Sequence, residues 1–395
     1  MKTKHLAQPI VFFFIACMGI IIWFFILSGN LNDAASWIYA IFLFIIFSMM
    51  MYTGKYSKYR RIFQVVFAIF FAISFIGIMI DERGSMSIPA DADSPMCHIV
   101  LPILLIPYTL TKTIVFRAQI INYFASVVSM FLIWFLATLV IGRGWCGWVC
   151  FYGGWEDGVS RLARKPRISL LSHNREIRSF QYAFFAFIIL VSVAAMSSVY
   201  CEWFCPFKII TEFEPITDPR SLMEGTIFIS AFVGLVLVMP FLTKKRFQCS
   251  AFCPFGAFQS LADNLSLYHI RFDTNKCRGC LQCVAACPFC AIDPETITEK
   301  RGKPESTCAK CGECIAVCPE NAISYEFAFA MKKKNGKAMC SRPEPKTQAG
   351  KFVQSILEPQ YLFVFSAFTF GLIISSRFVP DALHRIWQLI AGGAN

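Results

Sequence analysis

Charged residues are scarce in this chain. Only 16% of its 395 residues are Asp, Glu, Lys or Arg, whereas 56% are hydrophobic and 42 are Phe. This composition excludes an ordinary soluble domain of this length. A membrane-spanning helix needs about 20 consecutive apolar residues, and the sequence supplies such runs repeatedly. We therefore expect an integral membrane protein with a small soluble part.

Histidine is also rare, with five residues in the whole chain. No two of them are paired within an apolar run, which disfavours a haem cytochrome. The net charge of +12 comes mainly from Lys and Arg in short segments between apolar runs. This distribution is typical of positive-inside topology. We therefore expect a lipid membrane as partner and no nucleic acid.

Seven apolar runs are long enough to cross a membrane. They cover residues 9–28, 35–53, 62–80, 120–141, 179–199, 225–242 and 360–376. Basic residues follow the second, fourth and sixth runs, including Arg60 and Arg246, and place those loops in the cytoplasm. The loops on the other side are acidic. A further apolar stretch, 98–116, contains two prolines, and we interpret it as re-entrant or surface-bound.

The predicted fold is mainly α. It is a polytopic membrane helix bundle of about seven spans with a small α+β ferredoxin-like domain on the cytoplasmic face of the cell (inner) membrane. Residues 1–269 form the membrane domain with six spans, 270–325 the ferredoxin-like domain and 326–359 a basic linker. Residues 360–395 contain the last span, followed by either an interfacial helix or a simple packing helix.

Two cysteine runs in the polar segment carry the clearest motif. Each reads C-x2-C-x2-C-x3-C-P. The first run begins at Cys277 and the second run, which repeats it, begins at Cys308. In bacterial ferredoxins with this pattern, the fourth cysteine of each run ligates the other of two [4Fe–4S] clusters. We assign Cys277, Cys280, Cys283 and Cys318 to one cluster, and Cys308, Cys311, Cys314 and Cys287 to the other. Zinc also binds thiolate tetrads, but two complete runs disfavour it.

Three further cysteine pairs are spaced Cys-x-x-x-Cys. They are Cys146 with Cys150, Cys201 with Cys205, and Cys249 with Cys253. Residues four apart lie on one face of a helix, so each pair directs two thiolates the same way. Gly153 and Gly256 follow the first and third pairs at the same distance, which indicates an internal repeat. We expect these two pairs to share a third [4Fe–4S] site at the inner membrane boundary.

The predicted topology places the pair Cys201 and Cys205 on the outward side, together with Cys97. With His98 as a fourth ligand, these thiols form either an outer iron–sulfur centre or a disulfide. The sequence leaves both alternatives open. The remaining cysteines are assigned to packing: Cys17, Cys290 and Cys340.

The motifs GRGWCGWVC and QCSAFCPFGAF, with the two ferredoxin runs, resemble those of the NapH/NosR-type membrane polyferredoxins over residues 95–325. The resemblance implies electron transfer between quinol or cytoplasmic donors and a partner across the membrane. Two features depart from the family. Phe151 stands where proline usually follows the second cysteine, and the segment YCEWFCPFK is an addition. No recognisable flavin-attachment motif or extended outer domain is present.

The leading functional hypothesis is a membrane-bound iron–sulfur relay between a cytoplasmic or quinol redox partner and a partner at or across the membrane. A cytochrome, a quinone-reactive subunit or a ferredoxin-type protein would suit as partner. The first alternative is a quinol dehydrogenase subunit that binds a quinone, with Lys208, Glu212 and Glu214 handling protons. The second is an electron-donating maturation factor for another metalloenzyme. Catalytic residues are not assigned.

The two ferredoxin runs predict the iron content of the protein. Anaerobically purified protein should contain at least about eight irons per chain, because the runs ligate two cubanes. A content of roughly twelve would match a further cubane in the membrane domain. Iron and sulfide analysis measures this directly. Zinc in place of iron, or fewer than about five irons per chain, would contradict the assignment.

Overall fold

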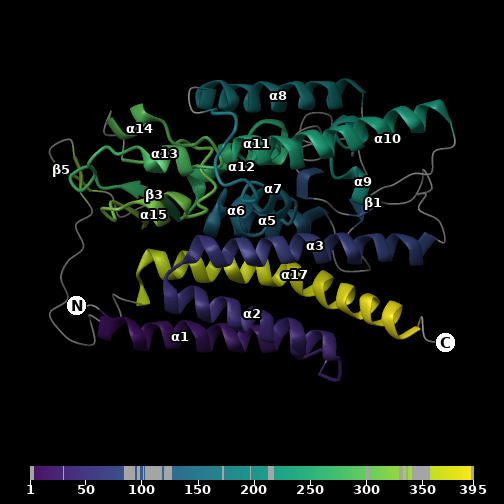
Figure 1. The fold of residues 1–395 in the computed structure, drawn as a ribbon, viewed down its shortest axis with the longest axis horizontal. Coiled ribbons are helices and arrows are strands. Elements are labelled where there is room, and N and C mark those ends of the chain that lie inside the picture. Colours follow the sequence, from purple (N-terminus) through teal and green to yellow (C-terminus); the bar gives the residue numbers. More distant parts are fainter. Residues whose placement is uncertain are drawn as a thin grey trace.

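A computed structural model describes most of the chain. The described residues are 4–29, 31–83, 94–95, 98–100, 102, 118–119, 127–170, 173–195, 197–211, 218–298, 302–328, 332–334, 337–339 and 356–392. Long helices run roughly along one axis, and a small module of short helices and strands lies at one end of them (Figure 1). Several predicted features therefore fall outside the described residues: Cys97, Cys340, Glu212, Glu214 and most of the stretch 98–116 and of the linker 326–359.

Six helical stretches in the described part are long and apolar enough to cross a membrane. They are Pro9–Leu27, Ala34–Thr53, Tyr56–Gly77, Asn174–Ala195, Pro219–Thr243 and Pro359–Ala391. The elements that form them are α1 (Lys4–Ile22), η1 (Trp23–Leu27), α2 (Ala34–Thr53), α3 (Tyr56–Arg83), α8 (Asn174–Ala195), α10 (Pro219–Ala231), η5 (Phe232–Val238), α11 (Met239–Thr243) and α17 (Pro359–Gly392). These agree with six of the seven predicted spans. The fourth, 120–141, is described as α5 (Val127–Ile141).

Helix α17 is longer than predicted. It continues through Pro380 as one helix of 34 residues, which is about 51 Å long. The tail after the last predicted span is therefore an extension of α17 and not a separate interfacial helix. Near its start, the ring of Phe363 stacks on that of Tyr325 in the module at 4.4 Å. Helix α17 thus connects the module to the bundle.

Two broken helical hairpins lie in the middle of the bundle, between α3 and α8 (Figure 1). The first hairpin, residues 144–159, and the second hairpin, residues 248–262, each turn at the second cysteine of a Cys-x-x-x-Cys pair. Their helices are α6 (Gly144–Trp148) and α7 (Tyr152–Val159) in the first, and η6 (Gln248–Phe252) and α12 (Pro254–Ala262) in the second. Non-helical backbone at such a depth is tolerated where protein surrounds it.

The contacts of the first hairpin with α3 define its depth. At its base, the carbonyl of Gly147 accepts a hydrogen bond from Arg60 at 2.6 Å. At its tip, the ring of Phe151 stacks on that of Phe71 at 3.6 Å. The chain then returns, since Asp157 pairs with Arg60 at 2.6 Å. Six residues separate Phe151 from Asp157 along α7, so the tip lies about 9 Å deeper than the base.

The module is built on two antiparallel strands, β3 (Tyr268–Phe272) and β4 (Ile323–Phe327). Between them lie α13 (Gln282–Ala286), α14 (Pro294–Thr298) and α15 (Glu313–Val317). This arrangement matches the predicted small α+β domain. The other described elements are β1 (Ser94–Pro95), η2 (His98–Val100), β2 (Ala118–Gln119), η4 (Tyr200–Phe204), α9 (Lys208–Thr211), η7 (Asp263–Leu265), β5 (Lys332–Lys334) and β6 (Lys337–Met339).

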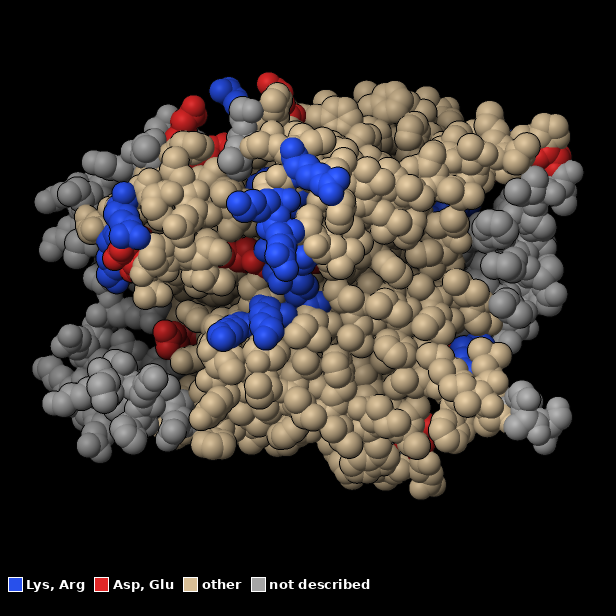
Figure 2. All heavy atoms as spheres, viewed as in Figure 1, with Lys and Arg blue, Asp and Glu red and all other residues tan. Residues whose placement is uncertain are grey.

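Basic side chains form a band between the module and the uncharged surface of the bundle (Figure 2). Two of the basic loops meet near the module, because Lys244 Nζ donates a hydrogen bond to the carbonyl of Arg164 at 3.1 Å and Lys244 lies close enough to Glu313 for an electrostatic interaction. In the same region Arg161 pairs with Glu313 of the module at 2.8 Å. The band therefore lies where the apolar surface of the bundle ends and the module begins.

Candidate metal centres

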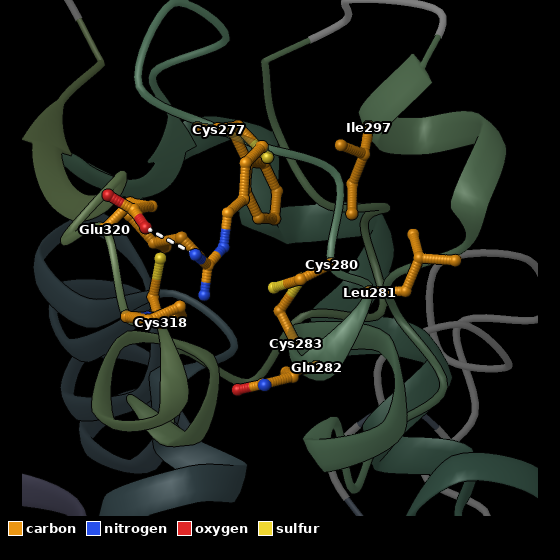
Figure 3. A pocket seen from close by; sticks show the side chains of 12 residues that line it. Cys277, Cys280, Leu281, Gln282, Cys283, Ile297, Cys318 and Glu320 are labelled. Atoms are coloured by element: carbon orange, nitrogen blue, oxygen red, sulfur yellow. Dashed lines mark ion pairs between the residues drawn. The ribbon is translucent and has the colours of Figure 1, made fainter.

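One set of four cysteines surrounds a cavity at the surface of the module. Cys277, Cys280, Cys283 and Cys318 line this cavity, and the thiols of the first run face Cys318 across it (Figure 3). Cys280 is exposed, whereas Cys283 is buried. We call these four residues the distal set. The structure thus brings together three cysteines of the first run and the fourth of the second, as the motif predicts.

A second set of four cysteines lies deeper. Cys287 acts electrostatically on Cys308, Cys311 and Cys314, which places it among the thiols of the other run. Burial raises the pKa of the Cys311 thiol to about 12, and it also raises the pKa values of Cys308 and Cys314. We call these four residues the proximal set. Both sets therefore contain one cysteine contributed by the other run.

The donor chemistry of both sets fits an iron–sulfur cluster. Within the described ranges, no group of three or more His, Cys, Asp or Glu side chains is compact enough to hold a single metal ion. A cubane has an iron at each of four corners, so its four thiolates need not converge on one point as they do around zinc. Burial raises the pKa of Cys283 to about 11. Such a thiol ionises at neutral pH only beside a strong cation, which the iron of a bound cluster would supply.

A short segment of the module connects the proximal set to the second hairpin. Lys245 Nζ donates a hydrogen bond to the carbonyl of Cys287 at 2.6 Å, and the backbone N–H of Arg246 donates to the carbonyl of Pro288 at 2.8 Å. The guanidinium of Arg246 also lies over the ring of Phe289, 4.7 Å from its centre. The segment 287–289 therefore passes directly from a predicted cluster ligand to the membrane hairpins.

The two hairpins bind each other by reciprocal hydrogen bonds. Arg246, three residues before Cys249, donates to the carbonyl of Cys146 at 3.0 Å. Arg143, three residues before Cys146, donates to the carbonyl of Cys249 at 3.5 Å. The internal repeat seen in the sequence is therefore also a structural repeat. The exchange holds the two Cys-x-x-x-Cys pairs against each other.

The glycines shared by the repeat leave space for this exchange. A Cβ added at Gly153 would overlap the guanidinium of Arg246. A Cβ added at Gly256 would lie 2.8 Å from the carbonyl oxygen of Cys249 and 3.6 Å from Arg143. Each hairpin thus carries a glycine where the arginine of the other hairpin, or the carbonyl that it binds, comes close.

The thiols of the two hairpin pairs lie in one region. Cys150 and Cys253 both act electrostatically on Cys249, while Cys146 lies within hydrogen-bonding reach of Arg143. This region extends from the base of the hairpins to their tips, so it reaches further into the bundle than the predicted inner boundary. His98, predicted to belong to an outer centre, instead has its Nε2 3.3 Å from the Cys150 sulfur.

The pair Cys201 and Cys205 lies beside α8, and its predicted place on the outward side of the membrane stays a prediction. After α8 the chain turns back, and the ring of Phe204 packs against that of Phe184 in the middle of α8 at 5.8 Å. Cys201, Cys205 and Cys253 all act electrostatically on Tyr200. The two pairs therefore share one neighbourhood. Cys97, the third thiol of that predicted centre, lies outside the described residues.

A sequence signal for this third pair was available. Both Cys205 and Cys253 stand in the tetrapeptide Phe-Cys-Pro-Phe, and the aromatic residue after each proline has an equivalent role. Phe207 stacks on Tyr152 at 4.1 Å, while Phe255 packs on His98 at 4.8 Å. The glycine that guided the repeat assignment is missing after Cys205, because no arginine has to pass there.

Known domains match these same parts of the chain. A family described as a 4Fe-4S binding domain matches residues 123–169, 180–213 and 225–271. Each of these segments contains one Cys-x-x-x-Cys pair, including the pair that the resemblance left unplaced. A 4Fe-4S dicluster domain matches residues 269–319, which contain both ferredoxin runs. No solved structure matches the chain.

Several curated proteins are similar to part of the chain. The regulatory protein NosR of Pseudomonas aeruginosa is 28% identical over 44% of this chain and 24% of its own length. The putative electron transport protein YccM of Escherichia coli is 21% identical over 43% of this chain and 48% of its own. The methylamine utilization ferredoxin-type protein MauN of Paracoccus denitrificans is 25% identical over 41% of this chain and 54% of its own length. The chain thus spans about half or less of each relative, and these matches confirm its resemblance to the NapH/NosR-type polyferredoxins.

The crossing of ligands between the runs can be tested at two neighbouring cysteines. Cys287→Ala should damage the cluster of the proximal set, because Cys287 lies among Cys308, Cys311 and Cys314. Cys290→Ala is the matched control, since Cys290 is a buried packing residue whose carbonyl accepts from Arg178 at 2.7 Å. Iron content and EPR spectra provide the measurement. Loss of a signal in the Cys290 variant alone would reverse the assignment.

The close approach at Gly153 predicts a large effect of a small substitution. Gly153→Ala should lower the unfolding free energy by about 1–3 kcal/mol, the usual range for overpacking, because the added methyl displaces Arg246. Gly225→Ala in α10 is the control, because its added Cβ has no atom within 4 Å in the described part of the chain. Thermal unfolding in detergent compares the two. Equal transition temperatures for the two variants would show that the hairpins can move apart without a loss of stability.

Proposed function

We propose that this chain, which resembles the NapH/NosR-type polyferredoxins in its 4Fe–4S binding domains, is an iron–sulfur electron-transfer protein of the inner membrane. Its module would face the cytoplasm, as the basic loops beside it suggest. The distal set would hold one [4Fe–4S] cluster and the proximal set a second. When bound, such clusters supply one-electron redox chemistry over a wide range of potentials.

The order of the thiol sets along the molecule supports this proposal most strongly. The distal set includes the exposed Cys280, which a soluble redox partner can approach. The proximal set is covered by the hairpins, since Gly147 packs against the backbone of Ala309 between two of its cysteines. Trp148 adds a hydrogen bond from its indole N–H to the carbonyl of Lys310 at 2.9 Å. The two sets and the hairpins therefore follow one another from the module surface into the bundle.

The hairpin thiols extend this order into the membrane. We propose that Cys146, Cys150, Cys249 and Cys253 hold a third [4Fe–4S] cluster between the two hairpins. The hydrocarbon core is about 30 Å thick, and the tip of the first hairpin lies about 9 Å deeper than Asp157. A centre between the hairpins would therefore cover only part of the membrane thickness.

The turned-back pair Cys201 and Cys205 lies in the neighbourhood of Cys253 in the second hairpin and would belong to the exit side of the relay. Its tyrosine neighbour connects it to the second hairpin, since the hydroxyl of Tyr200 accepts a hydrogen bond from Gln248 at 2.7 Å. We propose a redox partner on that side, such as a cytochrome or a quinone-reactive subunit. Of the residues predicted to handle quinol protons, Lys208 lies 5.2 Å from the ring centre of Phe228.

The shared hairpin cluster can be tested with single and double substitutions. Cys146→Ser and Cys249→Ser should each abolish the same EPR signal, because one cubane needs ligands from both pairs. The double variant should then lose no more iron than either single variant, since effects within one site are not additive. The distal and proximal signals should persist throughout. If the two single variants lose different signals, or if neither loses iron, the pairs do not share a site.

A further inference from the structure

Two arginines beside the hairpin thiols have hydrogen-bond donors without partners. Arg143 and Arg246 are both fully buried. Among the residues that the structure describes, Nε of Arg143 and both Nε and Nη1 of Arg246 have no hydrogen-bond acceptor. A buried guanidinium with free donors is unfavourable unless an anion completes it. The free donors therefore indicate that negative charge is needed beside these two guanidinium groups.

The guanidinium groups that carry these free donors lie beside the proposed ligands of the hairpin site. Arg246 Nη2 is 3.6 Å from the Cys249 sulfur, and Arg143 lies within hydrogen-bonding reach of the Cys146 thiol. Each arginine thus contacts a thiol of its own hairpin as well as a carbonyl of the other. The third pair differs, because Ser198 stands three residues before Cys201. The arginines accompany only the two pairs proposed to share a cluster.

The nearby carboxylates of Glu156 and Asp157 interact electrostatically with Arg246, but their hydrogen bonds go to other groups. Glu156 accepts hydrogen bonds from the backbone N–H groups of Gln248 and Cys249, at 2.7 and 3.2 Å. Asp157 pairs with Arg60 on α3 at 2.6 Å. Neither carboxylate thus accepts a hydrogen bond from the free donors. An anion between the hairpins remains the natural partner for both guanidinium groups.

We propose that Arg143 and Arg246 are positioning residues that stabilise an anionic [4Fe–4S] cluster between the hairpins and favour its reduced form. The proposal rests on the shared hairpin site described above. A cubane with four thiolate ligands carries net negative charge, which increases on reduction. Positive charge and hydrogen bonds to sulfur therefore stabilise the reduced state more than the oxidised state, and they do so strongly where water is excluded. Without this positive charge and these hydrogen bonds, burying an anion in the apolar bundle would cost much free energy.

The test compares neutral and charged replacements of the same side chains. Arg143→Gln and Arg246→Gln remove the charge, whereas Arg143→Lys and Arg246→Lys keep it but lose the planar fork. Redox titration monitored by EPR follows the signal that Cys146→Ser abolishes. At a fixed potential, each Gln variant should show at least a tenfold lower ratio of reduced to oxidised cluster, a downward shift of about 59 mV for one electron. The Lys variants should shift less.

A control separates this effect from general damage at the contact between module and bundle. Arg178 pairs with Asp293 at 2.6 Å and also binds the carbonyl of Cys290, so Arg178→Gln removes one positive charge there without touching the hairpins. Its hairpin signal should keep the wild-type potential. Iron analysis shows whether each variant retains the hairpin cluster.

Each possible result either supports or overturns the proposal. A Gln variant with full iron content and an unchanged potential overturns the proposal, as does a Lys variant that shifts as far as its Gln counterpart. If the Gln variants lose the hairpin cluster, retention of that cluster in the Lys variants supports the role of charge, and equal loss overturns it. A wild-type protein without any hairpin signal would instead refute the shared site on which the proposal rests.

Discussion

The reciprocal hydrogen bonds between the two hairpins are the interaction on which the rest of the structure depends. A polar backbone inside a membrane protein must be satisfied by the protein itself, and each hairpin breaks its helix at a cysteine. Arg246 and Arg143 supply donors to the carbonyls of Cys146 and Cys249 across the repeat. Arg60 supplies another to Gly147. Without these donors, neither hairpin could stay buried.

The same exchange fixes the position of the module. Arg246 also binds the backbone of Pro288 and lies over Phe289, so the residue that joins the hairpins also holds the segment after Cys287. Lys310 of the module makes a second contact, since its Nζ donates a hydrogen bond to the carbonyl of Ile141 at the end of α5, at 3.2 Å. The module is therefore packed against the bundle through buried contacts and is not joined to it by linkers alone.

Much of this architecture could be predicted from the sequence. Long apolar runs and the spacing of the ferredoxin cysteines are local signals, and they gave the helices and the module correctly. The hairpins were harder to predict, because a sequence does not distinguish buried arginines from exposed ones. Arg60 and Arg246 mark loop ends by the positive-inside pattern, yet both are fully buried. The turn that brings Cys201 back beside α8 depends on contacts between residues far apart in the chain, which periodicity does not reveal.

The distance along the chain between the two hairpins has a consequence for biosynthesis. The donor of Arg246 and the carbonyl of Cys146 are separated by 100 residues, and translation proceeds at roughly 5–20 residues per second. The first hairpin thus leaves the ribosome roughly 5–20 s before its partner exists. During that interval its buried arginine and its broken backbone cannot be satisfied within lipid. The first hairpin must therefore wait at the membrane surface or within the insertion machinery until the second arrives.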